Sequence, residues 1–284
     1  MDLSAAVTIQ RPGKAPLDIN TIRDPELVGN SPLSGYSIEY VDFSFVGISA
    51  FVEDIPQVDG VDGYEPYLGS RVITMAIAVY GATYGIFWDN ITQLLEALQP
   101  RPYSADTSVY PALGADGTRK LSFTQPKTSG EYSLYMMVRP AEMPRFTTDK
   151  SAFAGNPTLG YATMLNVMLT AEDPYKYYQT AQTFTRTGSG TISVVNTGTT
   201  ICWPTIVWAN GGTSSATSAS LGVDTVSHSA LSGTITDTFK TATSTSPMTL
   251  TSYSFFNIPP GTSSVSVTGA SSGTVSITIR EAIL

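Results

Sequence analysis

The sequence of 284 residues contains one cysteine, Cys202, and one histidine, His228. A single cysteine rules out a disulfide within the chain, and this scarcity is typical of proteins that fold in a reducing compartment. One histidine and one cysteine cannot supply a zinc site with the usual ligands, which argues against a transition-metal enzyme. We therefore expect no metal and no cofactor.

Charged residues are also few, at 13% of the chain, and the net charge is −8. Nucleic-acid binders and proteins that adhere to anionic membranes normally need a basic surface, so neither class is expected. No apolar run is long enough to span a bilayer, and the start Met1-Asp2-Leu3 lacks the basic and apolar regions of a signal peptide. The sequence predicts a soluble protein without an export signal of its own.

The charge is unevenly distributed along the chain. By direct count, residues 185–284 hold three basic and three acidic residues, which leaves 12 basic and 20 acidic residues in 1–184. Serine and threonine make up 41 of the last 100 residues. Turn residues gather in the segment 171–190, at Asp173-Pro174 and at 187–190. We therefore predict two domains, 1–180 and 181–284.

The first domain is predicted to be mainly β with one clear helix. Residues 87–98 place apolar side chains at helical spacing and are followed by Pro100. The nearly continuous apolar run 71–80 indicates a strand that is buried on both faces. Further strands are expected at 6–10, 36–45, 121–124, 132–139 and 161–170, with an exposed loop at 147–160.

The second domain alternates small polar with apolar residues in short segments between turns, which is the pattern of a β-sandwich. Strands are expected at 191–196, 203–208, 232–239, 249–257, 263–268 and 274–281. A disordered Ser/Thr-rich linker is the alternative interpretation. The segment 211–220 by itself is predicted to be a mobile loop.

The residues that could carry chemistry do not form a recognisable constellation. His228 follows Asp224 in a serine-rich stretch, and the pattern G-x-S-x-G occurs at 269–273. That pattern lies between two predicted strands and follows the histidine, against the chain order of the α/β-hydrolases. We interpret His228 as an exposed loop residue, and we predict no catalytic residue and a non-enzymatic protein.

An acidic segment at 53–65 contains Glu53, Asp54, Asp59, Asp62 and Glu65. Calcium takes such oxygen ligands, but the spacing is not that of an EF-hand loop. A solvated loop or a contact between subunits is the simpler interpretation, and a pair of glycosidase carboxylates is a further one. The three interpretations stay open.

Three aromatic residues of the second domain, Trp203, Trp208 and Tyr253, are candidates for a sugar-binding platform. Alternating core positions along strands explain the same residues more simply. The sequence leaves both interpretations in place.

Six segments carry a resemblance to a known family. In the first domain they are 71–81 with the following Phe87-Trp88 and the helix end at Leu98-Gln99-Pro100, then 132–140, then 164–177. In the second domain they are 195–207, 256–265 and 275–284. In order and spacing these segments resemble the distal tail protein (Dit) family of long-tailed, siphovirus-type phages, over most of residues 71–284.

The resemblance implies an N-terminal ring-forming domain and a C-terminal galectin-like β-sandwich that projects outward. It implies a homo-hexameric ring at the distal end of the tail, with the tail tube protein, the tail-tip hub protein and receptor-binding proteins as partners. DNA would pass through the ring without specific binding, and the acidic first domain would keep it from sticking. The location would be the virion tail tip after assembly in the host cytoplasm, with no membrane. The alternative function is a carbohydrate- or receptor-binding tail module, and a cell-envelope hydrolase is a third.

Overall fold

The computed structural model divides the chain into two compact units, Met1–Pro174 and Tyr175–Leu284. It describes residues 5–11, 14–23, 33–44, 46, 48–49, 52–54, 61–63, 67–99, 118–128, 130–146, 160–210, 217–228, 233–238, 242–244, 250–269 and 273–284. The division predicted at residue 180 falls inside the second unit, between β13 (Lys176–Tyr178) and β14 (Gln182–Thr187).

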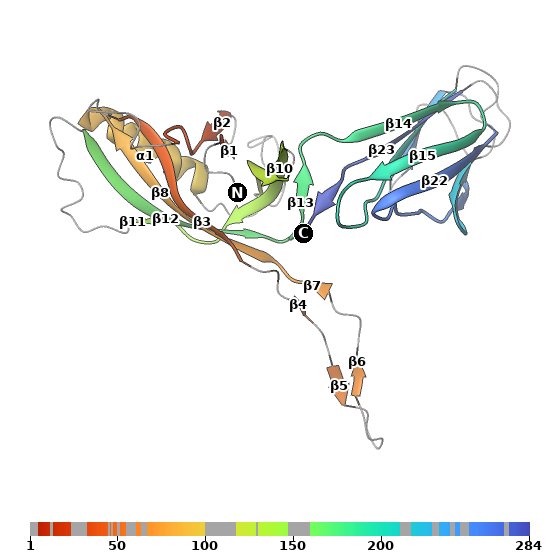
Figure 1. The fold of residues 1–284 in the computed structure, drawn as a ribbon, viewed down its shortest axis with the longest axis horizontal. Helices are drawn as coiled ribbons and strands as arrows, with labels where there is room; N and C mark the ends of the chain where they lie inside the picture. The colour runs from red at the N-terminus through yellow and green to blue at the C-terminus, as the bar shows by residue number, and fades with distance from the viewer. Residues whose placement is uncertain are drawn as a thin grey trace. The chain divides into compact units, whose positions relative to one another are not determined.

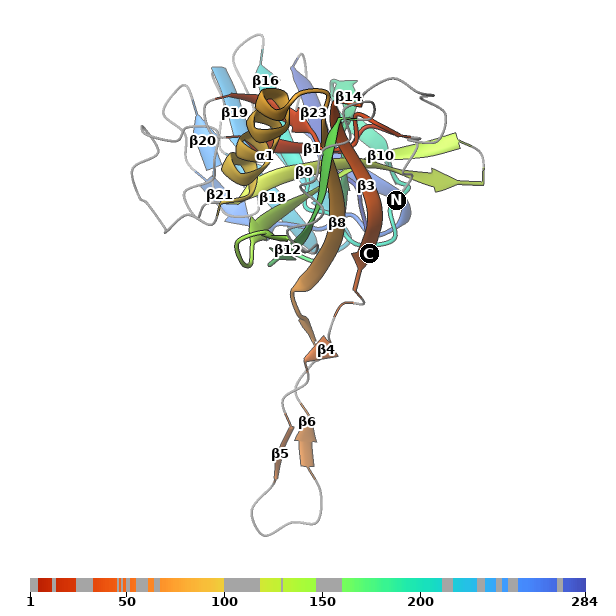
Figure 2. The same ribbon diagram turned by 90° about the vertical axis from the view of Figure 1, so that its left-hand side faces the viewer.

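The N-terminal unit is built on one antiparallel path of strands (Figures 1 and 2). Its order is β2 (Lys14–Asp18), β1 (Thr8–Arg11), β9 (Arg119–Lys127), β10 (Gly130–Pro140), β12 (Tyr161–Ala171), β8 (Arg71–Gly81) and β3 (Gly35–Phe43). The described pairing of β10 with β12 covers only their ends, so the path folds into a four-stranded and a three-stranded part. Phe43 of β3 packs on Phe123 of β9, with ring centroids 5.1 Å apart, so the two parts face each other.

Shorter strands complete this unit. β11 (Arg145–Phe146) pairs with β12. In the chain between β3 and β8, β4 (Ile48–Ser49) pairs with β7 (Tyr67–Leu68), and β5 (Val52–Asp54) pairs with β6 (Val61–Gly63). The loop predicted at 147–160 lies outside the described residues except for Gly160.

Strand β8 pairs along its whole length with β12, from Arg71–Ala171 to Gly81–Tyr161. Its residues alternate, so that Ile73, Met75 and Ile77 are fully buried while those between them are partly exposed. The prediction that both faces of this strand are buried therefore holds only near Ala78, which is 5% exposed, and is wrong for the rest of the strand. An antiparallel sheet can leave one face only partly covered, and the apolar run did not distinguish this from a sheet covered on both sides.

The predicted helix is confirmed as α1 (Tyr84–Leu98), which packs on β8 and also contacts β1 and β12. It begins three residues before the predicted start because the Thr83 side chain caps it, accepting a hydrogen bond from the Ile86 amide at 3.3 Å. Gln99 is extended, as expected for the residue before a proline. No helix among the described residues is long and apolar enough to cross a membrane.

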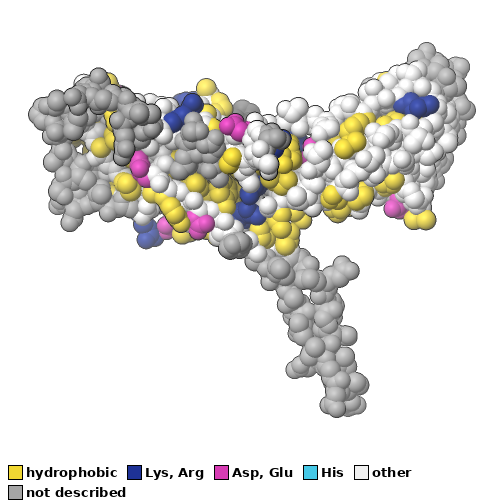
Figure 3. Space-filling view, in the orientation of Figure 1, with side chains coloured by type: hydrophobic (Ala, Val, Ile, Leu, Met, Phe, Trp, Pro, Cys, Tyr) yellow, Lys and Arg dark blue, Asp and Glu magenta, His cyan; other side chains and the backbone are white. Residues whose placement is uncertain are grey.

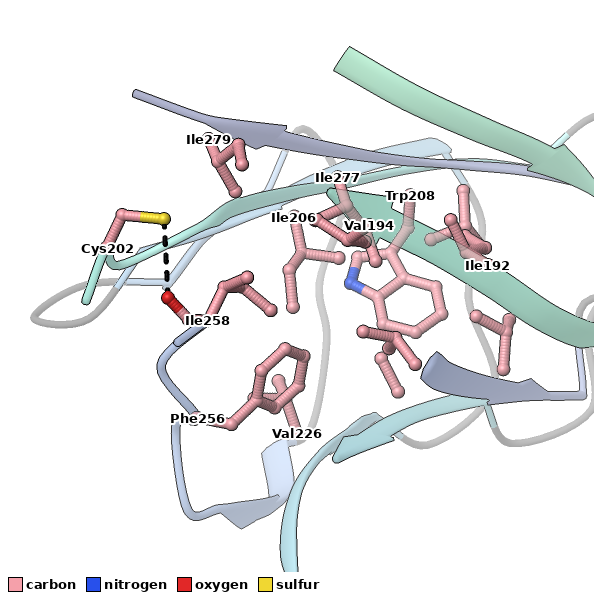
Figure 4. Close-up of a cluster of buried hydrophobic side chains, with 14 of the residues drawn as sticks. Ile192, Val194, Cys202, Ile206, Trp208, Val226, Phe256, Ile258, Ile277 and Ile279 are labelled. Carbon is pink, nitrogen blue, oxygen red and sulfur yellow. Dashed lines mark hydrogen bonds between the residues drawn. The ribbon is translucent and has the colours of Figure 1, made fainter. Parts of the chain in front are cut away.

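The C-terminal unit contains two five-stranded antiparallel sheets around one apolar core (Figure 4). The first sheet has the order β14, β23 (Thr274–Ile279), β16 (Thr205–Asn210), β19 (Gly233–Asp237) and β20 (Ala242–Ser244). The second has the order β15 (Gly190–Asn196), β22 (Gly261–Thr268), β17 (Thr217–Leu221), β18 (Asp224–His228) and β21 (Leu250–Tyr253). A short pair, β13 with β24 (Ala282–Ile283), lies outside both sheets.

This core contradicts the linker interpretation of the second domain. The loop predicted at 211–220 is wrong at its end, because β17 begins at Thr217 and buries Ala219 completely. Strand β18, which buries Val226 and His228, was not predicted. Ala219 lies between two serines, and Ser227 separates Val226 from His228, so the local composition is that of a loop while the alternation is that of a strand.

Two glycines near the start of α1 give a matched test of this packing. A Cβ on Gly81 would lie 2.3 Å from the backbone of Phe87, whereas a Cβ on Gly85 meets no atom within 4 Å. Gly81→Ala should therefore lower the free energy of unfolding of the N-terminal unit by about 2 kcal/mol, through overpacking. Gly85→Ala should raise it by about 0.5 kcal/mol, because alanine favours a helix. Calorimetry measures the free energy of unfolding of both variants. Equal changes in the two would contradict the close approach of α1 to β8.

Candidate functional site

His228 lies in the core of the C-terminal sandwich and is fully buried. Its Nε2 is 2.7 Å from Oδ2 of Asp237, which is equally buried. The same oxygen accepts a hydrogen bond from the Trp208 indole N–H at 2.7 Å. Since His228 belongs to β18 and the other two to β19 and β16, this polar link joins the two sheets through the core. The prediction of an exposed loop histidine is wrong.

The structure does not assemble the serine–histidine–aspartate arrangement considered from the sequence. Asp224 accepts a hydrogen bond from the hydroxyl of Ser254 and lies four residues before His228 on the same strand, roughly 13 Å away along β18. His228 instead contacts Asp237. The pattern at 269–273 lies partly outside the described residues. The histidine is therefore a structural element of the core.

The three aromatic candidates for sugar binding do not form one surface. Trp203 is 42% exposed and packs beside Phe255, with ring centroids 6.4 Å apart. Trp208 is 1% exposed and points into the core (Figure 4). Tyr253 ends β21, and its side chain lies outside what the structure describes. Of the two candidates whose side chains the structure describes, Trp203 alone lies at the surface.

Residues with metal-binding chemistry are dispersed in the part of the chain that the structure describes, where no three of them gather at one point. Cys202 is buried, and its pKa is raised to about 11 by burial and by the negative charge of Glu281. Of the acidic segment, Asp59 and Glu65 lie outside the described residues. Glu53 of β5 is the register partner of Asp62 of β6.

The closing strand of the chain is tied to the start of the second unit. Glu281 is 1% exposed, and its carboxylate accepts hydrogen bonds from the Thr197 amide and the Gln182 side chain. Arg280 donates to the carbonyl of Tyr178 at 3.0 Å. Two of these bonds fix Tyr178 and Gln182, which lie within the turn-rich segment 171–190. The separation of these residues by about a hundred positions explains why no local pattern indicated them.

No family model matches the sequence, and no curated protein matches it. The structure is similar to the crystal structure of the Dit protein of phage SPP1, with a TM-score of 0.63 and 16% identity over 99% of this chain and 100% of that one. The chain has the Dit fold. Two structures of the phage p2 baseplate in its activated conformation, one with Ca and one with Sr, each align with a TM-score of 0.49 and 7% identity over 97% of both chains.

The Dit likeness spans both units. It confirms, at the level of the fold, the resemblance on which the sequence analysis relied, and with it the mainly β class with one helix.

Asp237 and Asp224 offer a matched test of the polar link. Asp237→Ala should lower the free energy of unfolding of the C-terminal unit by about 3 kcal/mol, because it leaves buried polar groups on Trp208 and His228 without a partner. Asp224→Ala removes the same charge but only an exposed hydrogen bond, so its effect should stay below about 1 kcal/mol. Calorimetry distinguishes them, and equal losses would contradict the special position of Asp237.

Proposed function

We propose that this chain is a structural protein of a phage tail tip, without enzymatic activity. The observation that carries the proposal is the full-length likeness to the SPP1 Dit protein, which is described as a paradigm of the hub adsorption apparatus in phages that infect Gram-positive bacteria. The earlier resemblance of six segments to the Dit family supports it independently. The protein belongs to the virion tail and assembles in the host cytoplasm.

In this role the N-terminal unit forms a ring of six copies, which joins the tail tube protein to the tail-tip hub and lets DNA pass. A closed ring needs two different surfaces on each subunit, because every copy contacts its neighbours head to tail. The strand path of the N-terminal unit ends in two different edge strands, β2 and β3. Edges of this kind are a liability in a monomer and useful where a neighbour covers them.

The C-terminal sandwich is proposed to be a galectin-like domain that projects from the ring and carries other tail proteins. Its sequence has three basic and three acidic residues, and the face drawn in Figure 3 shows few charged side chains. A surface with little charge suits contacts with protein partners or neutral sugars better than contacts with nucleic acid. The absence of catalysis is supported by the position of His228, which contacts a core carboxylate and not a surface nucleophile.

Hexamer formation is the first test of the proposal. Sedimentation velocity of the purified protein at increasing concentration should show a species of six 30.2-kDa chains. The fraction of this species should rise with protein concentration, as mass action requires. A protein that stays monomeric at every concentration would contradict the ring.

A second candidate role is sugar binding by the C-terminal unit, favoured by the exposure of Trp203 beside Phe255. A glycan array with the wild-type protein should then show a ligand whose binding Trp203→Ala weakens at least tenfold, since an aromatic platform supplies most of the contact area. Val223→Ala is the control, because Val223 is 97% exposed on the same unit. Absence of binding at millimolar sugar, or equal loss in both variants, would exclude this role.

A further inference from the structure

Arg71, the first residue of β8, is buried, with 5% of its surface exposed. It occupies the same face of the strand as Ile73 and Met75, which belong to the core. Across the sheet its register partner is Ala171 of β12, which is also buried and has no polar side chain. A permanent positive charge therefore lies at the end of an apolar row.

Within the described part of the chain, no hydrogen bond or ion pair reaches the Arg71 guanidinium, and its Nε is buried without a partner. Burial lowers the pKa of Arg71, and no nearby carboxylate acts to restore it. Arg119 and Arg139 also have a buried Nε, but each makes a hydrogen bond or an ion pair through another nitrogen. Arg119 is fully buried but donates from Nη2 to the Gln99 carbonyl at 2.6 Å, and Arg139 pairs with Glu172 at 3.0 Å.

An unpaired buried cation is costly, because the loss of hydration is not offset by a counter-charge. Arginine cannot relieve this cost by losing its proton, because a guanidinium stays protonated in proteins. A methionine could fill a similar space without a charge. The presence of an arginine at this position is explained if a second chain supplies the counter-charge.

We infer that Arg71 is one half of an intermolecular ion pair, whose other half is an Asp or Glu carboxylate on a second copy of this chain. The inference rests on the proposed ring and names one of its contacts. A guanidinium offers parallel N–H donors that match the two oxygens of a carboxylate, and such bidentate pairs tolerate burial better than a lysine would.

Charge indicates a second copy as the source of the anion. Residues 1–184 carry 20 acidic and 12 basic residues, so a neighbouring copy presents carboxylates in excess. A DNA phosphate is a poor candidate, because one covered arginine is not the basic patch that nucleic acid requires.

The first experiment compares Arg71→Met with Arg119→Met. In dilute protein, Arg71→Met should raise the melting temperature of the N-terminal unit by a few degrees, because it removes an unpaired buried charge. Arg119→Met should lower it, because it removes the donor to the Gln99 carbonyl. At higher concentration Arg71→Met should raise the concentration for half-assembly at least tenfold, as measured by sedimentation, since the partner carboxylate loses its cation.

The second experiment identifies the carboxylate. Arg71→Lys protein is prepared with ¹⁴N and with ¹⁵N, mixed, assembled and treated with a carbodiimide. The reagent activates a carboxyl group, and the lysine amine displaces it to form an amide, while the reagent leaves as a urea. Mass spectrometry should find cross-linked peptides of mixed isotope composition that join position 71 to an Asp or Glu. Cross-links within one isotope only would show a contact inside the chain and overturn the inference.

The outcomes separate the inference from the proposed function. If wild-type protein and Arg71→Met assemble equally well, the ring stands and the role of Arg71 is wrong. A melting temperature lowered by Arg71→Met, as by Arg119→Met, would show that Arg71 is a structural cation of the single chain and also overturn the inference. If the wild-type protein never assembles, the ring and the ion pair fail together.

Discussion

The pairing of β8 with β12 is the contact on which the N-terminal unit depends. It runs over the whole of both strands, and its alternate residues form the apolar surface on which α1 packs. At one end, Gly81 lets the helix backbone approach the strand, and Gly160, with φ +82°, lies beside the Gly81 carbonyl. Arg71 lies at the other end of β8. One strand therefore sets both the packing of the helix and the position of the buried charge.

The C-terminal unit is stabilised by a different interaction. Its apolar core is crossed by the link of Asp237 to His228 and Trp208, which ties the two sheets together at one defined point. Apolar packing alone tolerates shifts between two sheets, whereas a hydrogen bond between buried groups requires one geometry. The carboxylate of Glu281 acts similarly at the end of the chain. A fixed orientation of the two sheets would suit the proposed role of carrying other tail proteins.

Much of the fold could be predicted from the sequence. The amphipathic pattern of α1 and the apolar run of β8 are local signals, and both indicated the correct element. The errors occurred where composition and alternation disagreed, as in β17 and β18, whose serines and threonines resemble a loop. The surroundings of His228 could not be predicted, because its partners lie on strands of the opposite sheet and no motif joins them.

The sequence by itself determined the class of the protein: two parts with different charge, mostly β, with one histidine and one cysteine. These properties follow from composition and from short-range periodicity, which are fully present in the linear chain. Only the tertiary structure decided which polar residues are buried and whether they have partners. Trp208 became a core residue, His228 a link between sheets and Arg71 a charge without a counter-charge in the described chain. Burial depends on residues far apart in sequence, so it is settled only when the strands pair.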